Sequence, residues 1–236
     1  MNLAELWAGA QGTYLIAEVG VNHDGDLARA LRLIDLASSH GADAVKFQAY
    51  KAAALAQADS PTYFQQTGAP AATQREFFAR SDQFGPTEYG RLATCAAEHS
   101  VEFLCTAFDE ETLGWIAPLV AGFKIASADL THHPLIEAIS VESLERPVLL
   151  STGASTMGEI TEAAALLATR EVTQIGLLHC VLSYPTAPQS AALGVLRQLE
   201  HRLGGLWNPP HRILGEHTAD VFVVVGYSDH TLATDD

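Results

Sequence analysis

The chain has 236 residues, of which 48% are hydrophobic, which is enough apolar material for one large domain or two small ones with a buried core. Its formal charge of −15 would repel a nucleic-acid backbone or an anionic membrane surface, so we expect neither as a partner. The three cysteines have no metal-ligand spacing, and no stretch suits a membrane helix or a signal peptide. We therefore expect a reduced, cytoplasmic protein.

Seven short runs rich in β-branched and aromatic residues alternate along the chain with segments at helical spacing. Most of these runs are continuously apolar, which is typical of parallel strands covered on both faces. The sequence predicts strands over residues 14–21, 43–50, 101–108, 122–127, 147–152, 174–180 and 221–227. It predicts helices over residues 27–40, 86–99, 110–119, 134–144, 157–169 and 189–203, with Asp109 and Ser155 as N-caps.

Two segments interrupt this repeat. Residues 51–85 are too long for an ordinary connection between a strand and a helix, so we interpret them as a lid or a substrate loop. Residues 204–220 carry turn signals and are expected to form a surface excursion.

The alternation of strands and helices fits either an open doubly wound sheet or an eight-stranded barrel that lacks its end. The pattern G-x-G-x-x-G is absent after the first strand, which weakens the first option. In barrels, the chemistry gathers at the carboxyl ends of the strands, and polar residues recur there in this sequence. We predict an α/β fold of the (β/α)8 TIM type, without the eighth strand, as a single domain over residues 1–236.

Charged side chains stand on three of the apolar strands. Glu18, in LIAEVGV, is costly to bury unless it forms an ion pair or serves the chemistry. Lys46 and Gln48 share one face of the second strand, and Lys124 lies in GFKIAS. Two such lysines indicate an interior site for an anion, unless each extends to solvent. Hydroxyls for the same site come from Thr106, Ser127, Ser151, Thr152 and Ser228.

Three histidines near strand ends are candidates for other roles. His23 belongs to an NHDG turn, and its role stays open. His179 is flanked by Leu178 and Cys180, which favours a buried histidine with satisfied hydrogen bonds over a ligand. Asp229 and His230 follow the seventh strand and suit either metal binding or a hydrogen-bonded pair that fixes the imidazole tautomer.

Seven tracts, taken in order, resemble the sialic acid synthase family, which includes N-acetylneuraminate, legionaminate and pseudaminate synthases. They are IAEVGVNHDGD, ADAVKFQAY, FLCTAFDEE, FKIASADLTHHPLI, PVLLSTGAS, LLHCVLSYPTAP and GYSDHT. The resemblance implies a (β/α)8 barrel followed by a small antifreeze-like domain, in a homodimer. It also implies condensation of phosphoenolpyruvate with an N-acetylated amino sugar, such as N-acetylmannosamine, and release of phosphate. A divalent metal, commonly Mn²⁺ with Mg²⁺ as the alternative, would assist.

The resemblance also implies roles for individual residues. Glu18 would be the acid/base carboxylate, and His230 would be one of two metal-binding histidines. The sugar or the forming intermediate would be contacted by Gln48, Asp129 and Tyr184, with Tyr184 also among the catalytic residues. Phosphoenolpyruvate would be held by the catalytic lysines and by hydroxyls: Lys46, Thr106, Lys124, Ser127, Ser151 and Ser228.

The sequence departs from the family pattern at three places. Asp129 stands where relatives often carry glutamate, and Leu182 stands where some neuraminate synthases carry asparagine, so the acceptor sugar stays open. The chain also stops before the eighth strand, which would bring the second metal histidine, and before the antifreeze-like domain. We therefore expect a fragment, or a chain stabilised by association, with His211 and His217 as weak substitutes for the second ligand.

Two other functions compete with the synthase. One is a noncatalytic remnant that binds phosphoenolpyruvate or a partner. The other is a different barrel synthase that uses phosphoenolpyruvate and a phosphorylated sugar.

Overall fold

The structure, a computed structural model, describes residues 1–8, 12–62, 71–207 and 221–232. The chain divides into two compact units, unit 1 (Met1–Ala121) and unit 2 (Gly122–Asp236). Both units combine parallel strands with helices, so the predicted α/β class is confirmed. The barrel of the (β/α)8 type without its eighth strand and the single domain over residues 1–236 stay predictions.

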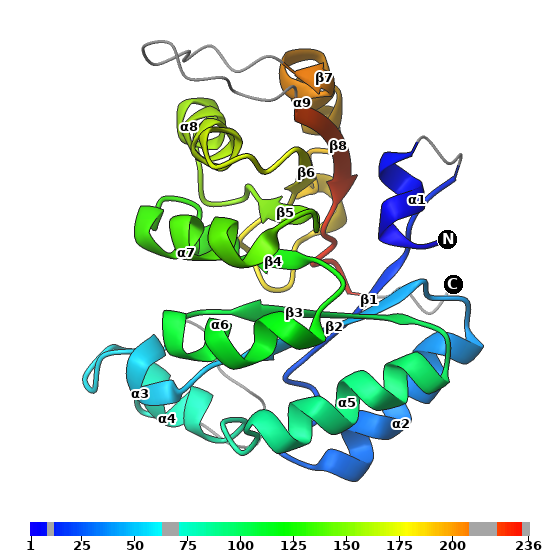
Figure 1. The fold of residues 1–236 in the computed structure, drawn as a ribbon. Coiled ribbons are helices and arrows are strands. Elements are labelled where there is room, and N and C mark those ends of the chain that lie inside the picture. The colour runs from blue at the N-terminus through cyan, green and yellow to red at the C-terminus, as the bar shows by residue number, and fades with distance from the viewer. Residues whose placement is uncertain (9–11, 63–70, 208–220, 233–236) are drawn as a thin grey trace. The chain divides into compact units, whose positions relative to one another are not determined.

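Unit 1 is built on three parallel strands, each in hydrogen-bonded register with the next. They are β1 (Ile16–Gly20), β2 (Ala44–Ala49) and β3 (Glu102–Ala107). The connecting helices α2 (Leu27–Ser39) and α5 (Pro86–Glu98) lie side by side along these strands (Figure 1). The other helices of unit 1 are α1 (Leu3–Trp7), α3 (Ala52–Leu55), α4 (Gln74–Ala79), α6 (Glu110–Ile116) and η1 (Ala117–Leu119).

Local sequence signals explain where the helices of unit 1 begin. Asp26 caps α2 by accepting from Ala28 N, and Asp109 caps α6 by accepting from Thr112 N, as predicted. At the start of α5, the Glu88 carboxylate accepts from Gly85 N at 2.8 Å. The apolar faces of these elements meet in a core that includes Ile34, Phe47, Leu92 and Leu104.

Within its described residues, unit 2 contains four parallel strands and one short antiparallel strand. The parallel strands are β4 (Phe123–Ile125), β5 (Val148–Ser151), β6 (Gln174–His179) and β8 (Val221–Tyr227). The antiparallel strand β7 (Gly205–Trp207) pairs with β8. The helices are η2 (Ser127–Asp129), α7 (His133–Ser143), α8 (Met157–Thr169), η3 (Pro188–Ser190) and α9 (Gly194–Leu203).

Every predicted strand has a counterpart in β1–β6 or β8. Two details of the prediction are wrong, and the surface excursion over residues 204–220 stays a prediction. The N-cap of α8 is Thr156, because Thr156 and Glu159 form a reciprocal capping box, and Ser155 lies one residue too early. The predicted helix over residues 189–203 is split into η3 and α9. The segment 204–220 begins with β7, and its residues 208–220 lie outside the described residues.

Two sequence-based expectations about the environment of the chain can be compared with the structure. Cys105 and Cys180 are buried, Cys95 is partly buried, and all three are free thiols, as expected for reduced core residues. Among the helices in the described ranges, none has both the length and the apolar character needed to cross a membrane.

Candidate active site

In unit 1, Lys46 and Glu18 form an ion pair between the adjacent strands β1 and β2. The two residues face each other in the β1–β2 register, and Lys46 Nζ lies 2.5 Å from Glu18 Oε2. Lys46 is only 8% exposed, so the alternative in which it extends to solvent is wrong. The Glu18 side chain is 47% exposed, so its carboxylate is held by Lys46 and is still accessible to water. An ion pair is therefore the observed state of Glu18.

Two further predicted residues lie close to this ion pair. Lys46 Nζ donates to Thr106 Oγ1 at 3.4 Å. Gly20 has φ +54°, and a Cβ placed on it would lie 3.1 Å from Glu18 Oε1 and 3.5 Å from Gln48 Nε2. Glycine is favoured here because its backbone has a positive φ, and a Cβ would also lie tightly against the Glu18 carboxylate. Glu18, Lys46, Gln48 and Thr106 thus form one cluster, the unit 1 cluster.

In unit 2, Lys124 is 5% exposed and again does not extend to solvent. Its ammonium donates to Ser151 Oγ at 2.7 Å and to the carbonyl of Ile125 at 2.8 Å. Because the lysine hydrogen occupies one lone pair of the Ser151 oxygen, the serine hydroxyl hydrogen can turn towards another acceptor. Lys124 and Ser151 therefore form a pair of buried donors at adjacent strands β4 and β5.

Asp129 closes the short helix η2, which begins at Ser127 directly after β4. Burial raises the pKa of Asp129, while the charges of His132 and Lys124 oppose this rise. Within the described part of the chain, Asp129 Oδ2 is buried and has no hydrogen-bond partner. A buried carboxylate oxygen without a donor is costly, so Asp129 suits contact with a donor group of a ligand.

His230 and Tyr184 form a second contact in unit 2, between the segments that follow β8 and β6. The rings have centroids 4.2 Å apart, and Tyr184 Oη lies 3.2 Å from His230 Nε2. His230 Nδ1 lies 2.6 Å from the carbonyl of Val181, which can only accept, so Nδ1 carries the proton. Nε2 is then the nitrogen with the lone pair, as in metal-binding histidines whose other nitrogen donates to a carbonyl.

The neighbours of His230 settle two of the sequence alternatives. Asp229 accepts from Thr231 N at 2.9 Å and from Thr231 Oγ1 at 3.0 Å. The carbonyl of Val181 therefore fixes the tautomer of His230. The alternative in which Asp229 fixes it through a hydrogen-bonded pair is wrong. His179 is buried and its Nε2 lies 2.8 Å from the carbonyl of Ala191, which confirms a satisfied buried histidine.

The described ranges hold no group of three or more His, Cys, Asp or Glu side chains that could bind a metal ion, so the metal site with His230 as a ligand stays a prediction. His211 and His217 lie outside the described residues.

The remaining predicted residues have structural contacts or open surroundings. Ser228 donates its backbone N–H to the carbonyl of His179 at 2.8 Å, which ties the end of β8 to the end of β6. Thr152 directs its hydroxyl to the carbonyl of Leu178 at 3.2 Å. Ser127 and Tyr184 are at least partly accessible, and Tyr184 is 54% exposed.

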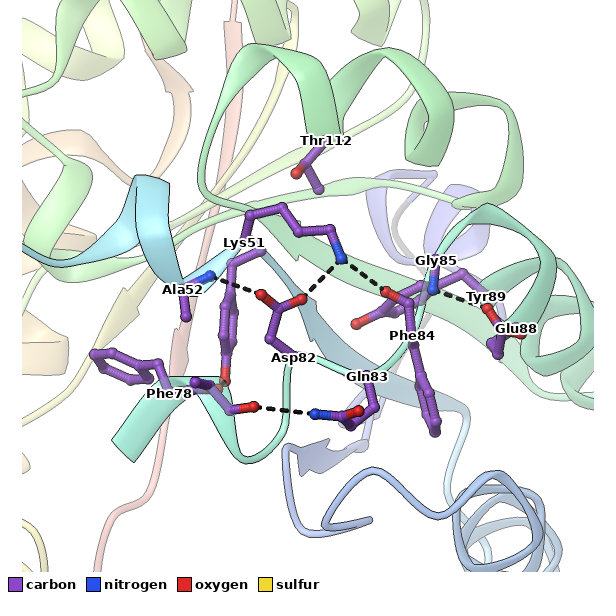
Figure 2. Close-up of polar contacts among 12 residues, drawn as sticks. Lys51, Ala52, Phe78, Asp82, Gln83, Phe84, Gly85, Glu88, Tyr89 and Thr112 are labelled. Carbon is purple, nitrogen blue, oxygen red and sulfur yellow. Dashed lines mark hydrogen bonds and ion pairs between the residues drawn. The ribbon is translucent and has the colours of Figure 1, made fainter. Parts of the chain in front are cut away.

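Three residues at the carboxyl end of β2 were not predicted, namely Lys51, Asp82 and Tyr89 (Figure 2). Lys51 Nζ lies 2.8 Å from Asp82 Oδ1, and Tyr89 donates its hydroxyl to the carbonyl of Gln48 at 2.5 Å. Tyr89 occupies a buried position of an amphipathic helix, where a tyrosine hydroxyl needs a partner, and this was the available signal in the sequence.

Comparison with known proteins identifies the family. The model of the NeuB family matches residues 33–207, which is most of the chain. The chain belongs to the NeuB family. Among its relatives in this family, an uncharacterized protein, MJ1065, of Methanocaldococcus jannaschii is 34% identical over 93% of this chain and 56% of its own length. N,N'-diacetyllegionaminic acid synthase of Campylobacter jejuni is 33% identical over 93% of this chain and 61% of its own length.

A solved structure supports the same grouping for this NeuB-family chain. The N-acetylneuraminic acid synthetase of Leptospira borgpetersenii, solved in complex with citrate, has a TM-score of 0.73 and 29% identity. The similarity covers 94% of this chain and 66% of that protein. The resemblance to sialic acid synthases is therefore confirmed. The chain spans between a half and two thirds of the length of the curated relatives named above.

Proposed function

We propose that this NeuB-family chain condenses phosphoenolpyruvate with an N-acetylated hexose to give a nonulosonic acid and phosphate. Two named relatives are synthases of sialic-type acids. One observation carries the proposal: Lys46 and Lys124 are both buried, and each donates to a hydroxyl on a neighbouring strand. These hydroxyls, Thr106 and Ser151, lie in the carboxyl halves of β3 and β5. Buried ammonium groups suit an anion that carries several charges, because the anion offsets the loss of hydration.

Lys124 and Ser151 would bind phosphate or carboxylate oxygens of phosphoenolpyruvate from unit 2. Ser127 and Ser228 would add hydroxyls there. In unit 1, Lys46 donates to Glu18 and Thr106, and an ammonium has three N–H groups, so a substrate oxygen would take a further hydrogen bond. These local cations let an acidic protein hold an anionic substrate.

Glu18 would act as the acid/base group. In the proposed reaction, C3 of phosphoenolpyruvate attacks the aldehyde carbon of the open-chain sugar, a carbon–carbon bond forms, and the aldehyde oxygen takes a proton from solvent to become a hydroxyl. Positive character develops at C2, where water adds, and the accessible Glu18 carboxylate takes one proton of that water. In the resulting intermediate the C2 hydroxyl loses its proton to solvent and becomes the ketone oxygen, while the bond between C2 and the bridging oxygen breaks and that oxygen leaves with phosphate.

A divalent metal, Mn²⁺ with Mg²⁺ as the alternative, remains part of the proposal. When bound, it would supply Lewis-acid polarisation of the aldehyde oxygen. His230 offers Nε2 as one ligand, and the ligand set in the described residues is otherwise incomplete. We therefore assign no step of the reaction to the metal.

From the family resemblance, we propose Gln48, Asp129 and Tyr184 as the residues that contact the acceptor sugar. Leu182 is exposed, and it would present an apolar surface to the sugar where some neuraminate synthases carry asparagine. We further propose that the protein acts in the cytoplasm as a homodimer.

A second candidate is a protein that binds phosphoenolpyruvate without turnover. It is favoured by one observation, the buried pair of donors Lys124 and Ser151, which suits binding of an anion whether or not a reaction follows. Binding needs the buried lysines, whereas turnover needs the complete ligand set.

Calorimetric titration with phosphoenolpyruvate tests both candidates. Lys124→Met should weaken binding by more than about tenfold, because the loss of a charge-assisted hydrogen bond removes that much affinity. Lys51→Met is the matched control, because Lys51 lies beyond β2, is exposed, and pairs with Asp82. Equal affinity of Lys124→Met and wild type would contradict the proposed binding site. Phosphate release with a panel of N-acetylated hexoses, with and without a chelator, then separates a synthase from a binding protein.

A further inference from the structure

The segment Lys51–Gly85, which we call the β2–α5 segment, has its two ends joined by the Asp82 carboxylate. We call the residues that join the ends, Lys51, Asp82 and Phe84, the neck. Asp82 Oδ1 pairs with Lys51 at 2.8 Å, and Asp82 Oδ2 accepts from Ala52 N at 2.9 Å (Figure 2). Lys51 is the N-cap residue of α3, but its side chain makes no capping hydrogen bond. Asp82, from the far end of the segment, instead accepts from the first N–H group of the helix. Lys51 Nζ also donates to the carbonyl of Phe84 at 3.3 Å.

The described parts of the segment are also held together beyond the neck. Tyr50 donates its hydroxyl to the carbonyl of Phe78 at 3.3 Å, and Arg75 Nε donates to the carbonyl of Ala56 at 2.8 Å. Pro61 and Thr73 form an antiparallel bridge. The two ends of the segment therefore enter and leave at one place, the carboxyl end of β2.

Tyr89 lies just after this neck, in the first turn of α5. It is 4% exposed, and its ring packs near those of Phe84 and Trp115, at centroid distances of 6.1 Å and 5.2 Å. Its hydroxyl donates to the carbonyl of Gln48 at 2.5 Å. Burial raises the pKa of Tyr89, so the hydroxyl stays a donor at every pH at which the protein would be studied.

This hydrogen bond is made where β2 leaves its pairing with β1. The β1–β2 register ends at the pair Gly20 and Phe47, and Gln48 is the next residue of β2. The Gln48 side chain lies beside Gly20, close to the Glu18 carboxylate. Because Tyr89 fixes the Gln48 carbonyl, it restricts the backbone at Gln48 and with it the position from which the Gln48 side chain starts.

We propose that Tyr89 is a positioning residue for Gln48, and that the neck formed by Lys51, Asp82 and Phe84 holds Tyr89 in place. The hydroxyl of Tyr89 does not touch substrate. It sets the peptide of Gln48 so that the side-chain amide meets the acceptor sugar at the edge of the unit 1 cluster. The role in sugar binding rests on the proposed function, whereas the effect on Gln48 does not.

Tyr89→Phe tests the proposal, because it removes only the hydroxyl. Tyr14→Phe is a matched control: Tyr14 is a partly buried tyrosine of unit 1, and its hydroxyl donates to Glu102 Oε2 at 2.6 Å, at the first residue of β3. In phosphate-release assays we expect Tyr89→Phe to raise the KM for the amino sugar by about fivefold and to leave the KM for phosphoenolpyruvate within about twofold of wild type. Tyr14→Phe should change neither constant by more than about twofold.

A second measurement does not depend on turnover. In isotope-labelled protein, the backbone amide of Ala49 and the side-chain amide of Gln48 report on the Gln48 peptide. Both signals should shift in Tyr89→Phe and stay in place in Tyr14→Phe. Unmoved signals, or an equal effect of both variants on the KM for the amino sugar, would overturn the positioning role. If wild type releases no phosphate with any sugar but the two signals shift as expected, the proposed function fails in this chain and the positioning of Gln48 stands.

Discussion

The carboxyl end of β2 in unit 1 and the carboxyl ends of β6 and β8 in unit 2 are built differently. At β2, the side chains of the unit 1 cluster are held by other side chains, as in the pair Glu18–Lys46, and Tyr89 fixes the backbone of Gln48. At β6 and β8, His230 and Tyr184 hold each other, with the carbonyl of Val181 as a further partner, and Tyr184 is half exposed.

This difference separates stability from function. Because the unit 1 cluster is packed into the sheet, changes near it should affect both the free energy of unfolding and ligand binding. Because His230 and Tyr184 lie near the surface, changes there should affect function with little loss of stability.

The largest expected effect is on function in unit 2. We expect His230→Ala to lower phosphate release by more than about 100-fold, because it removes the proposed metal ligand. We expect the free energy of unfolding to change by less than about 1 kcal/mol. His201→Ala, at an exposed position of α9, is the control and should match wild type in both measurements. A large loss of stability in His230→Ala would contradict the claim that changes in this region affect function but not stability.

A smaller effect is expected at the neck of the β2–α5 segment. Asp82→Asn removes the charge that pairs with Lys51 and keeps a side-chain oxygen for Ala52 N. Because the Lys51 side chain is half exposed, solvent weakens this pair, and we expect a loss of only about 0.5–1 kcal/mol in denaturant unfolding.

Asp59→Asn, an exposed position in the same segment, is the control for that measurement. If Asp82→Asn and Asp59→Asn unfold at the same denaturant concentration as wild type, the neck does not stabilise unit 1.

The smallest expected effect is a pH dependence of stability at His23. His23 is fully buried and stacks on Phe84, with ring centroids 4.4 Å apart. Burial lowers its pKa below the ordinary value of 6.5, Arg29 acts in the same direction, and the nearby Asp24 opposes them. The unfolded chain therefore binds the proton more readily, so the stability from neutral His23 is complete above pH 6.5 and is lost as the pH falls below it.

Unfolding midpoints at pH 7.5 and pH 5.5 would measure this effect. The loss between the two pH values should be smaller in His23→Gln than in wild type, since glutamine does not titrate in this range. An equal loss in both proteins would assign the pH dependence to other groups.

The sequence predicted the strands well because their continuous apolar runs are a local property. The short elements α1 and α3 were missed because four or five residues show no helical periodicity. The choice between Ser155 and Thr156 as N-cap was available from the sequence, because only Thr156 has a glutamate three residues later.

The candidate site was predicted in part. The positions of Lys46, Lys124 and Glu18 on apolar strands pointed to partnered charges; the structure shows both lysines buried and Glu18 paired with Lys46 but half exposed. The sequence signalled that the Tyr89 hydroxyl needs a partner, but the partners of Tyr89 and Asp82 were not predictable, because each contact joins segments that lie at least 30 residues apart in the chain. Tertiary contacts of this kind leave no periodic signal in the sequence.

Phosphate release from phosphoenolpyruvate in ¹⁸O-labelled water, with a panel of N-acetylated hexoses, tests the proposed condensation most directly. Because the bond between C2 and the bridging oxygen breaks, the account predicts release that requires one of the sugars, and phosphate without the label. Label in the phosphate would show cleavage at phosphorus. That result, or release that does not require a sugar, would contradict the account.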